Sequence, residues 1–116
     1  MQINIHSQGL DVEPAIERFV VSRVNSALER YEARIRSVDV FLRDINGPKG
    51  GLDKTVVISV RLDGHLPITV TAVRDSLESA ITVAAQLARR RAKRCVRKQQ
   101  QFERLTVRNS QFAMER

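Results

Sequence analysis

The fold is decided by the stretch TVVISVRLDGHLPITVTAV, residues 55–73. Apolar and polar side chains alternate over residues 55–62 and again over residues 68–73, on either side of Asp63-Gly64. Alternation with a period of two is typical of a strand that buries one face, and Asp-Gly is a strong tight-turn signal. The stretch therefore predicts a hairpin of two strands. Its largely polar second face predicts a sheet that covers a core on one side only.

Two further strands are expected upstream of this hairpin. Residues 38–43 alternate in the same way, and a glycine-rich loop over residues 47–51 separates them from the hairpin. At the N-terminus, Ile3 and Ile5 alternate with polar neighbours, which predicts a short strand with one buried face.

Helical periodicity fills the segment between the first two strands. From Ala15 to about Ile35, apolar residues recur at helical spacing, and Pro14 suits the first turn because its missing N–H costs nothing there. The apolar stripe consists of Ile16, Val20, Val24, Ala27, Leu28, Tyr31 and Ile35. We therefore expect one amphipathic helix over this segment.

A second helix is expected from Ser76 to about Gln100, with Asp75 as its cap and Glu78 as the capping-box partner. Its apolar face consists of Leu77, Ile81, Ala84, Ala85, Ala88, Ala92 and Cys95. Such a helix is about 37 Å long, whereas a strand of eight residues covers about 27 Å. We therefore expect the basic end of the helix to overhang the sheet.

Together these elements predict an α/β fold of the α+β type, in the order β-α-β-β-β-α. A right-handed crossover sets the first helix between two parallel strands, and the second helix covers the same apolar face. The result is a two-layer sandwich: a four-stranded mixed sheet with two helices on one face. Residues 1–100 are expected to form one domain, and residues 101–116, which lack clear periodicity, a flexible C-terminal tail.

Positive charge is concentrated in one short stretch of the second helix. The chain has 20 Lys and Arg against 13 Asp and Glu, a formal net charge of +7. Seven of the basic residues, and no acidic one, lie within ten positions: Arg89, Arg90, Arg91, Lys93, Arg94, Arg97 and Lys98. In the rest of the chain, basic and acidic residues are equal in number, so this stretch carries the whole excess of positive charge. Localised charge of this kind is typical of a protein that binds a polyanion, either nucleic acid or an anionic membrane.

The spacing of these residues argues against a simple solvated helix face. Arg90 and Arg94, like Lys93 and Arg97, are like-charged pairs four residues apart, which destabilise an isolated helix. Five of the seven are Arg, whose planar guanidinium suits bidentate contact with phosphate. Three more arginines of the first helix line up at intervals of seven and four and could extend this surface: Arg23, Arg30 and Arg34. Alternatively, Arg30 and Arg34 neutralise Glu29 and Glu32.

The sequence shows no catalytic or metal-binding constellation. His6 and His65 lie far apart without spaced Cys, Asp or Glu partners, and Cys95 falls on an apolar helix face. The glycine-rich loop lacks the ending of a phosphate loop. No stretch of roughly 18 apolar residues occurs, and the N-terminus lacks the pattern of a signal peptide. We therefore expect a cytoplasmic protein that is not an enzyme, with no catalytic residues, metal or cofactor.

Several short motifs, in their order and spacing, resemble the ribosome hibernation factor family, which includes hibernation-promoting factors and the ribosome-associated inhibitor called protein Y. The similarity covers about residues 1–98. The motifs are Met1-Gln2-Ile3-Asn4-Ile5, Pro14-Ala15-Ile16, Leu28-Glu29-Arg30-Tyr31, Ser37-Val38-Asp39-Val40 and Asp75-Ser76-Leu77-Glu78-Ser79-Ala80-Ile81. Glu78 departs from the family, which commonly has an aromatic residue there. We expect a short member, without the C-terminal domain by which long members pair ribosomes.

The resemblance implies a partner and a mechanism. Family members bind the small ribosomal subunit in the channel for messenger RNA and tRNA anticodon stems, through basic residues of both helices. Carried onto this chain, the rRNA-binding residues are Arg89, Arg90, Lys93, Arg94, Arg97 and Lys98, and more loosely Arg23, Arg30 and Arg34. The function implied is inhibition of translation by occlusion of the channel.

Two other functions are compatible with the residues. A general double-stranded RNA binder also sets two helices on an antiparallel sheet, but such domains tend to have basic residues at the start of the last helix, where this chain has Asp75 and Glu78. A protein-interaction module, such as a sigma-factor modulator, would dock through the exposed sheet face around Phe41 and Val57 or through the tail.

Overall fold

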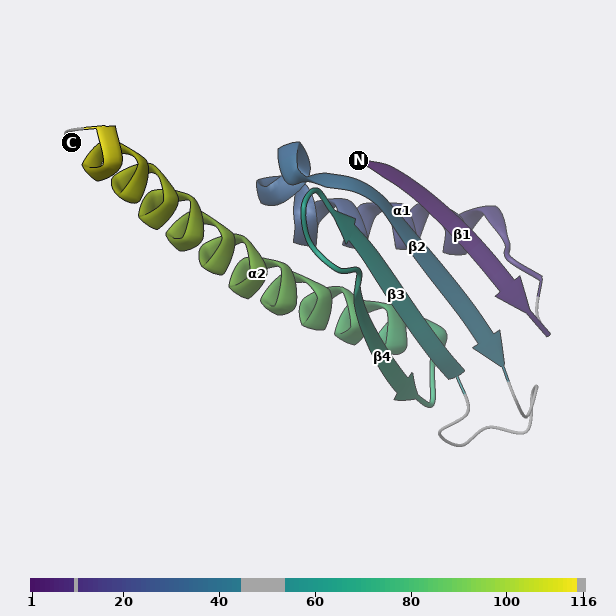
Figure 1. The fold of residues 1–116 in the computed structure, drawn as a ribbon. Coiled ribbons are helices and arrows are strands. Elements are labelled where there is room, and N and C mark those ends of the chain that lie inside the picture. Colours follow the sequence, from purple (N-terminus) through teal and green to yellow (C-terminus); the bar gives the residue numbers. More distant parts are fainter. Residues whose placement is uncertain (10, 45–53, 115–116) are drawn as a thin grey trace.

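The computed structural model describes residues 1–9, 11–44 and 54–114, with side chains as far as Arg104. Its elements are β1 (Gln2–Gln8), α1 (Pro14–Leu28), η1 (Glu29–Arg34), β2 (Ile35–Asp44), β3 (Lys54–Leu62), β4 (Ile68–Arg74) and α2 (Leu77–Met114). Figure 1 shows this path. The predicted order β-α-β-β-β-α is confirmed, with a short 3-10 helix, η1, added. The glycine-rich loop of residues 47–51 lies outside the described residues.

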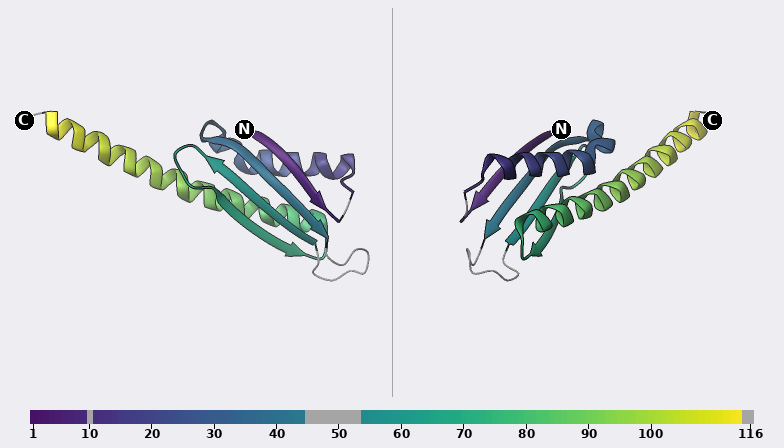
Figure 2. Two further views of the ribbon diagram at one scale, coloured as in Figure 1. Left: turned by 45° about the vertical axis from the view of Figure 1, so that its right-hand side comes forward. Right: turned by 180° about the vertical axis from the view of Figure 1, so that it is seen from behind.

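The four strands form one mixed sheet in the order β1-β2-β3-β4. β1 pairs parallel to β2, whereas β2–β3 and β3–β4 are antiparallel. The register places Ile5 opposite Val40, Val40 opposite Ile58 and Ile58 opposite Val70, so each strand contributes one apolar residue to the same row. Both helices cover the same face of this sheet (Figure 2), as the sequence predicts.

The core lies between the helices and this face of the sheet. Alternate strand residues are buried there, while the residues between them point to the opposite face, which neither α1 nor α2 covers. From the helices, α1 supplies the buried Val20, Val24 and Leu28, and α2 supplies Ile81 and a row of fully buried alanines: Ala80, Ala84, Ala88 and Ala92. A side chain as small as alanine lets α2 lie close to the sheet, and each buried Val, Leu or Ile contributes about 1.5–3 kcal/mol to folding.

The first helix ends well before the predicted Ile35. α1 stops at Leu28, the 3-10 helix η1 follows, and Ile35 is a buried strand residue paired with Leu62. The backbone N–H of Asp63 donates to the carbonyl of Arg34 at 2.9 Å, which ties the end of η1 to the β3–β4 hairpin. A 3-10 helix rises about 2.0 Å per residue, so it carries the chain to the sheet in fewer residues than an α-helix. Pairing with the sheet therefore overrides the helical spacing of Ile35.

The N-terminus of α1 is as predicted, whereas the N-terminal cap of α2 is a different residue. Pro14 opens α1 as expected. α2 starts at Leu77, and its cap is Ser76 rather than Asp75, because the backbone N–H of Ser79 donates to Ser76 Oγ at 3.2 Å. A serine hydroxyl in this position satisfies one N–H of the first turn, which leaves Glu78 to contribute its negative charge at the helix N-terminus.

The predicted hairpin turn at Asp63-Gly64 is confirmed and contacts α2. Gly64 has a φ of +71°, a left-handed conformation that favours glycine. The backbone N–H of His65 donates to the carbonyl of Leu62 at 3.4 Å across the turn. From α2, Gln99 Nε2 donates to the carbonyl of Asp63 at 3.0 Å, so the hairpin marks the place where the helix leaves the sheet.

The basic part of α2 does not overhang the sheet, contrary to the prediction. Ala92 and Val96 within it are buried, and α2 continues to Met114 rather than ending near Gln100. β3 has nine residues, about 30 Å, and the first 20 residues of α2 cover the same length. The part of α2 that extends past the hairpin in Figure 1 is therefore its C-terminal end. That residues 101–116 form a flexible tail separate from a domain of residues 1–100 stays a prediction.

Candidate nucleic-acid interface

One stripe of α2 carries most of the predicted cations. Positions 90, 93, 94, 97, 98 and 101 are spaced by three and four residues, so they share one face of the helix, opposite the buried alanines. These six residues line a shallow hollow of about 360 Å³: Arg90, Lys93, Arg94, Arg97, Lys98 and Gln101. All six side chains are exposed. The hollow therefore presents positive charge from five residues of a single helix.

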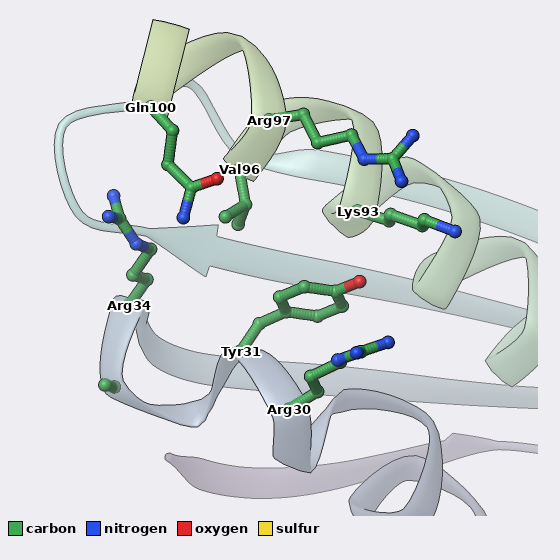
Figure 3. A pocket seen from close by; sticks show the side chains of 8 residues that line it. Arg30, Tyr31, Arg34, Lys93, Val96, Arg97 and Gln100 are labelled. Atoms are coloured by element: carbon green, nitrogen blue, oxygen red, sulfur yellow. The ribbon is translucent and has the colours of Figure 1, made fainter. Parts of the chain in front are cut away.

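η1 adds two more arginines to this stripe. Arg30 and Arg34 line a second hollow, of about 390 Å³, together with Lys93, Arg97 and Gln100 of α2. Figure 3 shows these side chains from η1 and α2 facing the same space. Because Lys93 and Arg97 line both hollows, the two join in one positive area. We call it the basic surface, made of Arg30, Arg34, Arg90, Lys93, Arg94, Arg97 and Lys98.

Tyr31 forms the floor of the second hollow. Its side chain is half-buried and packs against the core, and Val96 of α2 lines the same space. In Figure 3 its hydroxyl points out of the core, on the side where Arg30 and Lys93 lie. A phenol both donates and accepts hydrogen bonds. The spacing of Tyr31 in the sequence predicts only a place in the apolar stripe, although its position between Arg30 and Arg34 indicates that it accompanies them.

The charges of the basic surface are almost uncompensated. Arg34 Nη1 lies 3.4 Å from Glu103 Oε1, an exposed pair of α2 and η1. Within the part of the chain that the structure describes, the side chains of the other six residues have no carboxylate partner and no hydrogen bond. Exposed ion pairs contribute only about 0–1 kcal/mol, so even Arg34 stays available. Seven cations side by side repel one another, and a polyanion would relieve that repulsion.

The other cations named in the sequence analysis lie at the edge of the basic surface or outside it. Arg89 and Arg91 are exposed on α2 but line neither hollow. On α1, Arg23 places its guanidinium carbon 5.1 Å from the ring centroid of Phe19, a cation–π contact. The structure therefore brings Arg30 and Arg34 together with the α2 stripe and does not bring Arg23 into either hollow. That any of these residues contacts RNA stays a prediction.

Groups suited to catalysis or metal binding are scattered. Among the described residues, no three His, Cys, Asp or Glu side chains lie together as a metal site would need. His6 Nε2 lies 3.2 Å from Asp39 Oδ1 on the sheet, and His65 Nδ1 lies 2.8 Å from the carbonyl of Leu66. Cys95 is half-buried and packs against the core. None of the helices in the described part of the chain has the length and apolar character needed to cross a membrane.

The geometry of the basic surface suits phosphate groups. Guanidinium groups form paired hydrogen bonds with phosphate oxygens, and each neutralised phosphate releases counterions from nucleic acid. Arg30 and Arg97 approach the second hollow from two elements, so a phosphate there would meet cations from both sides. A half-buried aromatic ring beside them adds a surface for a ribose or a base.

Comparisons with known proteins agree with this fold. Residues 3–100 match the family described as Sigma 54 modulation protein / S30EA ribosomal protein. No curated protein matches the chain. A ribosomal subunit interface protein from Coxiella burnetii is 21% identical, with a TM-score of 0.67 over 81% of this chain and 96% of that one. The Protein Y N-terminal domain from Thermus thermophilus is 23% identical, with a TM-score of 0.69 over 81% of this chain and 98% of that one.

At these identities the two solved structures establish a shared fold, whereas the family match spans most of the chain. It ends at residue 100, close to the point where α2 passes the hairpin. The resemblance noted in the sequence is thereby confirmed. The chain belongs to the Sigma 54 modulation protein / S30EA ribosomal protein family, and so to the ribosome-associated proteins.

Proposed function

We propose that this protein inhibits translation by binding rRNA of the small ribosomal subunit through its basic surface. Seated there, the folded body would occupy the channel that messenger RNA and tRNA anticodon stems otherwise fill. Inhibition would follow from exclusion of these substrates, with no chemical step and no cofactor. The cytoplasm, where ribosomes work, is then the place of action.

A single observation carries the proposal: Arg30 and Arg34 of η1 and Lys93 and Arg97 of α2 line one hollow, and only Arg34 has a carboxylate partner among the described residues. Two elements far apart in sequence thus combine their charge on one side of the molecule. A fully solvated surface of a folded protein ordinarily mixes charges of both signs. Unpaired cations from two elements are the arrangement that a phosphate backbone would neutralise.

A rigid body is the second requirement of a mechanism based on occlusion. The sheet and both helices share one buried core, and Val24, Val40 and Ile58 within it have no exposed surface. Densely packed cores deform little, so a body of this kind would hold its shape against an incoming RNA strand. Binding affinity and steric exclusion would then come from different parts of the molecule, the basic surface and the core.

The test is charge reversal of three residues of α2, Arg90→Glu, Arg94→Glu and Arg97→Glu in one chain. All three are exposed, so we expect the fold to be retained and co-sedimentation with small subunits to be lost at low salt. Inhibition of translation in a cell-free system should disappear with it. Wild-type binding itself should weaken steeply with salt, because each neutralised phosphate releases counterions.

A matched control separates local contacts from net charge. Reversal of Arg18, Arg61 and Arg74 changes the net charge by the same amount, and all three are exposed residues outside the basic surface. This control should keep most of the binding. If the α2 reversal leaves co-sedimentation and inhibition intact, or if the control abolishes them equally, the proposed function is wrong.

General binding to RNA duplexes is the nearest alternative. The start of α2, where duplex-binding domains tend to be basic, has the exposed Glu78 in its first turn, while the cations begin about three turns later. A plain RNA duplex in excess should therefore compete poorly with small subunits. Equal affinity for both would replace the proposed function with the general one.

Docking on another protein is favoured by a different observation. The sheet face opposite α1 and α2 exposes Phe41 and Val73, which are 43% and 38% accessible. A partner such as a sigma factor, named in the description of the family, would use that face rather than the basic surface. Its binding should survive the α2 charge reversal, which distinguishes it from rRNA binding.

A further inference from the structure

The sheet face away from the helices carries an ordered row of side chains. By register, His6, Phe41, Val57 and Thr71 lie side by side across β1 to β4. The next row toward the β2–β3 connection is Gln8, Arg43, Thr55 and Val73. Side chains of alternate residues point to one face, so both rows stand on the outer face of the sheet. Aromatic, apolar, hydroxyl and cationic groups therefore meet in one small area.

His6 and Phe41 form a stacked pair at the centre of this area. Their ring centroids lie 4.7 Å apart, with an angle of 17° between the planes. His6 is held in place by Asp39, whose Oδ1 lies 3.2 Å from its Nε2 and accepts a hydrogen bond from Asn4 Nδ2 at 3.3 Å. The orientation of both rings is thus set before any ligand binds, which lowers the entropy cost of binding.

Phe41 has one ring face that His6 does not cover. β1 lies on one side of β2 and β3 on the other, so His6 covers the face toward β1 and leaves the face toward Val57. The side chain of Phe41 remains 43% exposed. A hollow of about 530 Å³ opens there, and its lining includes His6, Gln8, Phe41, Arg43, Thr55 and Val57. We call it the outer hollow.

Arg43 supplies a positive charge at the same place. It is exposed, it lines the outer hollow, and among the described residues its guanidinium has no carboxylate partner and no hydrogen bond. Phe41 and Arg43 are two residues apart on one strand, hence about 7 Å apart on the same face. This pairing of an open aromatic face with a free guanidinium matches the base and the phosphate of a nucleotide.

We propose that the outer hollow binds one unpaired nucleotide of single-stranded RNA. The base stacks on the open face of Phe41, Arg43 contacts the phosphate, and Gln8 and Thr55 offer polar groups to the edge of the base. Bases stack on aromatic side chains without regard to sequence, since every base has a π-face. This site lies on the opposite side of the sheet from the basic surface. It therefore extends the proposed function by a second RNA contact.

The size of the outer hollow favours a nucleotide over a protein partner. A specific protein interface buries about 800 Å² on each side, with a central apolar anchor. The exposed apolar groups on this face are few, Phe41 and Val73, and polar residues lie around them: Gln8, Asn4, Asp39, Ser59, Thr69 and Thr71. A single planar base needs only the ring of Phe41 and its immediate neighbours.

The test uses a short uridine hexaribonucleotide with 2-aminopurine at one central position, because stacking quenches the fluorescence of this base. The parent chain carries the reversals Arg90→Glu, Arg94→Glu and Arg97→Glu, which disable the basic surface. We expect quenching to persist in this parent and to be lost with Phe41→Leu, together with about a tenfold loss of affinity. Phe41→Tyr keeps the aromatic face and should keep the quenching.

Arg43→Gln tests the phosphate contact in the same parent chain. It should weaken binding of the hexanucleotide several-fold and reduce the slope of log affinity against log salt by about one. Arg61→Gln is the matched control, an exposed arginine on the same sheet face that does not line the outer hollow. It should leave the quenching unchanged.

The inference is overturned if the parent chain does not quench the probe, or if Phe41→Leu quenches as well as the parent does. A site that binds protein instead of RNA gives the first of these results. No ribosome takes part in this assay, whereas the test of the proposed function measures ribosome binding by the α2 charge reversal. Failure of one is thus distinguishable from failure of the other.

Discussion

Among the described residues, Glu103 is the acidic side chain that contacts the basic surface. Its Oε1 lies 3.4 Å from Arg34 Nη1, and both side chains are partly exposed, at 53% and 31%. An ion pair this accessible contributes little to folding, because water and salt screen it. Toward a polyanion, however, Glu103 is one negative charge beside seven cations. Its main physical effect is therefore on binding rather than on stability.

Glu103→Gln should accordingly strengthen binding to small subunits about two- to fivefold at low salt, the range that a surface ion pair supports. The free energy of unfolding should change by less than about 1 kcal/mol. Binding is measured by sedimentation or fluorescence titration, and stability by urea denaturation. Glu17→Gln, which removes a charge from the first turn of α1, is the control and should leave the affinity unchanged. Weaker binding by Glu103→Gln would contradict this role.

Some residues of the basic surface can be predicted from the sequence, and others cannot. Lys93 and Arg97 stand out because they belong to a run without any acidic residue. Tyr31 does not, since its spacing fits an apolar helix stripe equally well, and only the packing of η1 beside α2 places it in the hollow. The pair of His6 and Phe41 cannot be predicted from the sequence either, because the two residues are 35 positions apart, on two strands that no local pattern relates.

At the scale of elements, the β3–β4 hairpin positions α2. The carbonyl of Asp63 accepts a hydrogen bond from Gln99, Asp63 Oδ1 lies 2.7 Å from Arg36 Nε, and the N–H of Asp63 donates to Arg34. One turn thus contacts α2, β2 and the end of η1. These contacts hold η1 and α2 in the relative position on which the second hollow of the basic surface depends.

Gly64 makes this turn possible, and Gly64→Ala tests its importance. Its φ of +71° costs a residue with a Cβ about 1–2 kcal/mol, and that Cβ would lie 3.2 Å from Gln99 Nε2. We expect the free energy of unfolding to fall by about 1–2 kcal/mol in urea denaturation. Gly64→Asn should lose less, because asparagine tolerates this conformation better. Full stability of the alanine variant would show that the turn adopts another conformation.

For α2, the sequence predicts a helix with the right buried face but not the residues at which the helix begins and ends. Its alanine row and its cations follow from spacing, and both are where the sequence predicts them. Its start is displaced to the Ser76 cap, and its end lies at Met114 instead of near Gln100. Similarly, the predicted first helix is divided into α1 and η1, because Ile35 pairs with the sheet.

The whole molecule is elongated, with extents of 70 × 23 × 19 Å. A compact two-layer body forms one part, and α2, about 57 Å long for its 38 residues, continues beyond it (Figure 1). The last described contacts of α2 with this body are those of Gln99 with Asp63 and of Glu103 with Arg34. The basic surface thus lies beside the body, before the helix projects.

Deletion of residues 105–116 should therefore leave the body and the basic surface intact. We expect a change of less than about 1 kcal/mol in the free energy of unfolding and at most a twofold change in affinity for small subunits. Both are measured on the truncated chain by urea denaturation and sedimentation. A longer deletion, from residue 99 onward, removes both of the last contacts and should lower the free energy of unfolding and the affinity for small subunits. Loss of binding in the shorter deletion would place residues 105–116 in the interface.

The fold class, the buried faces and the location of the excess charge could all be predicted from the residues and their spacing. These properties depend on short-range periodicity. The period is two residues in the strands around Asp63-Gly64, and the spacing is three to four residues in the alanine row and among Arg90, Arg94 and Arg97. The chemistry of those residue types then sufficed to predict a polyanion as the partner. Catalysis, by contrast, had no spacing pattern in its favour.

Which residues share a site, in contrast, follows from the three-dimensional packing of the elements. Arg30 and Arg34 meet Lys93 and Arg97 because η1 follows α1 at the edge of the core, and His6 meets Phe41 because β1 pairs parallel to β2 in one register. A register shift of one residue would move each side chain to the other face of the sheet. Such contacts join residues 30 or more positions apart. They are set by how the elements pack together, which no local pattern in the chain records.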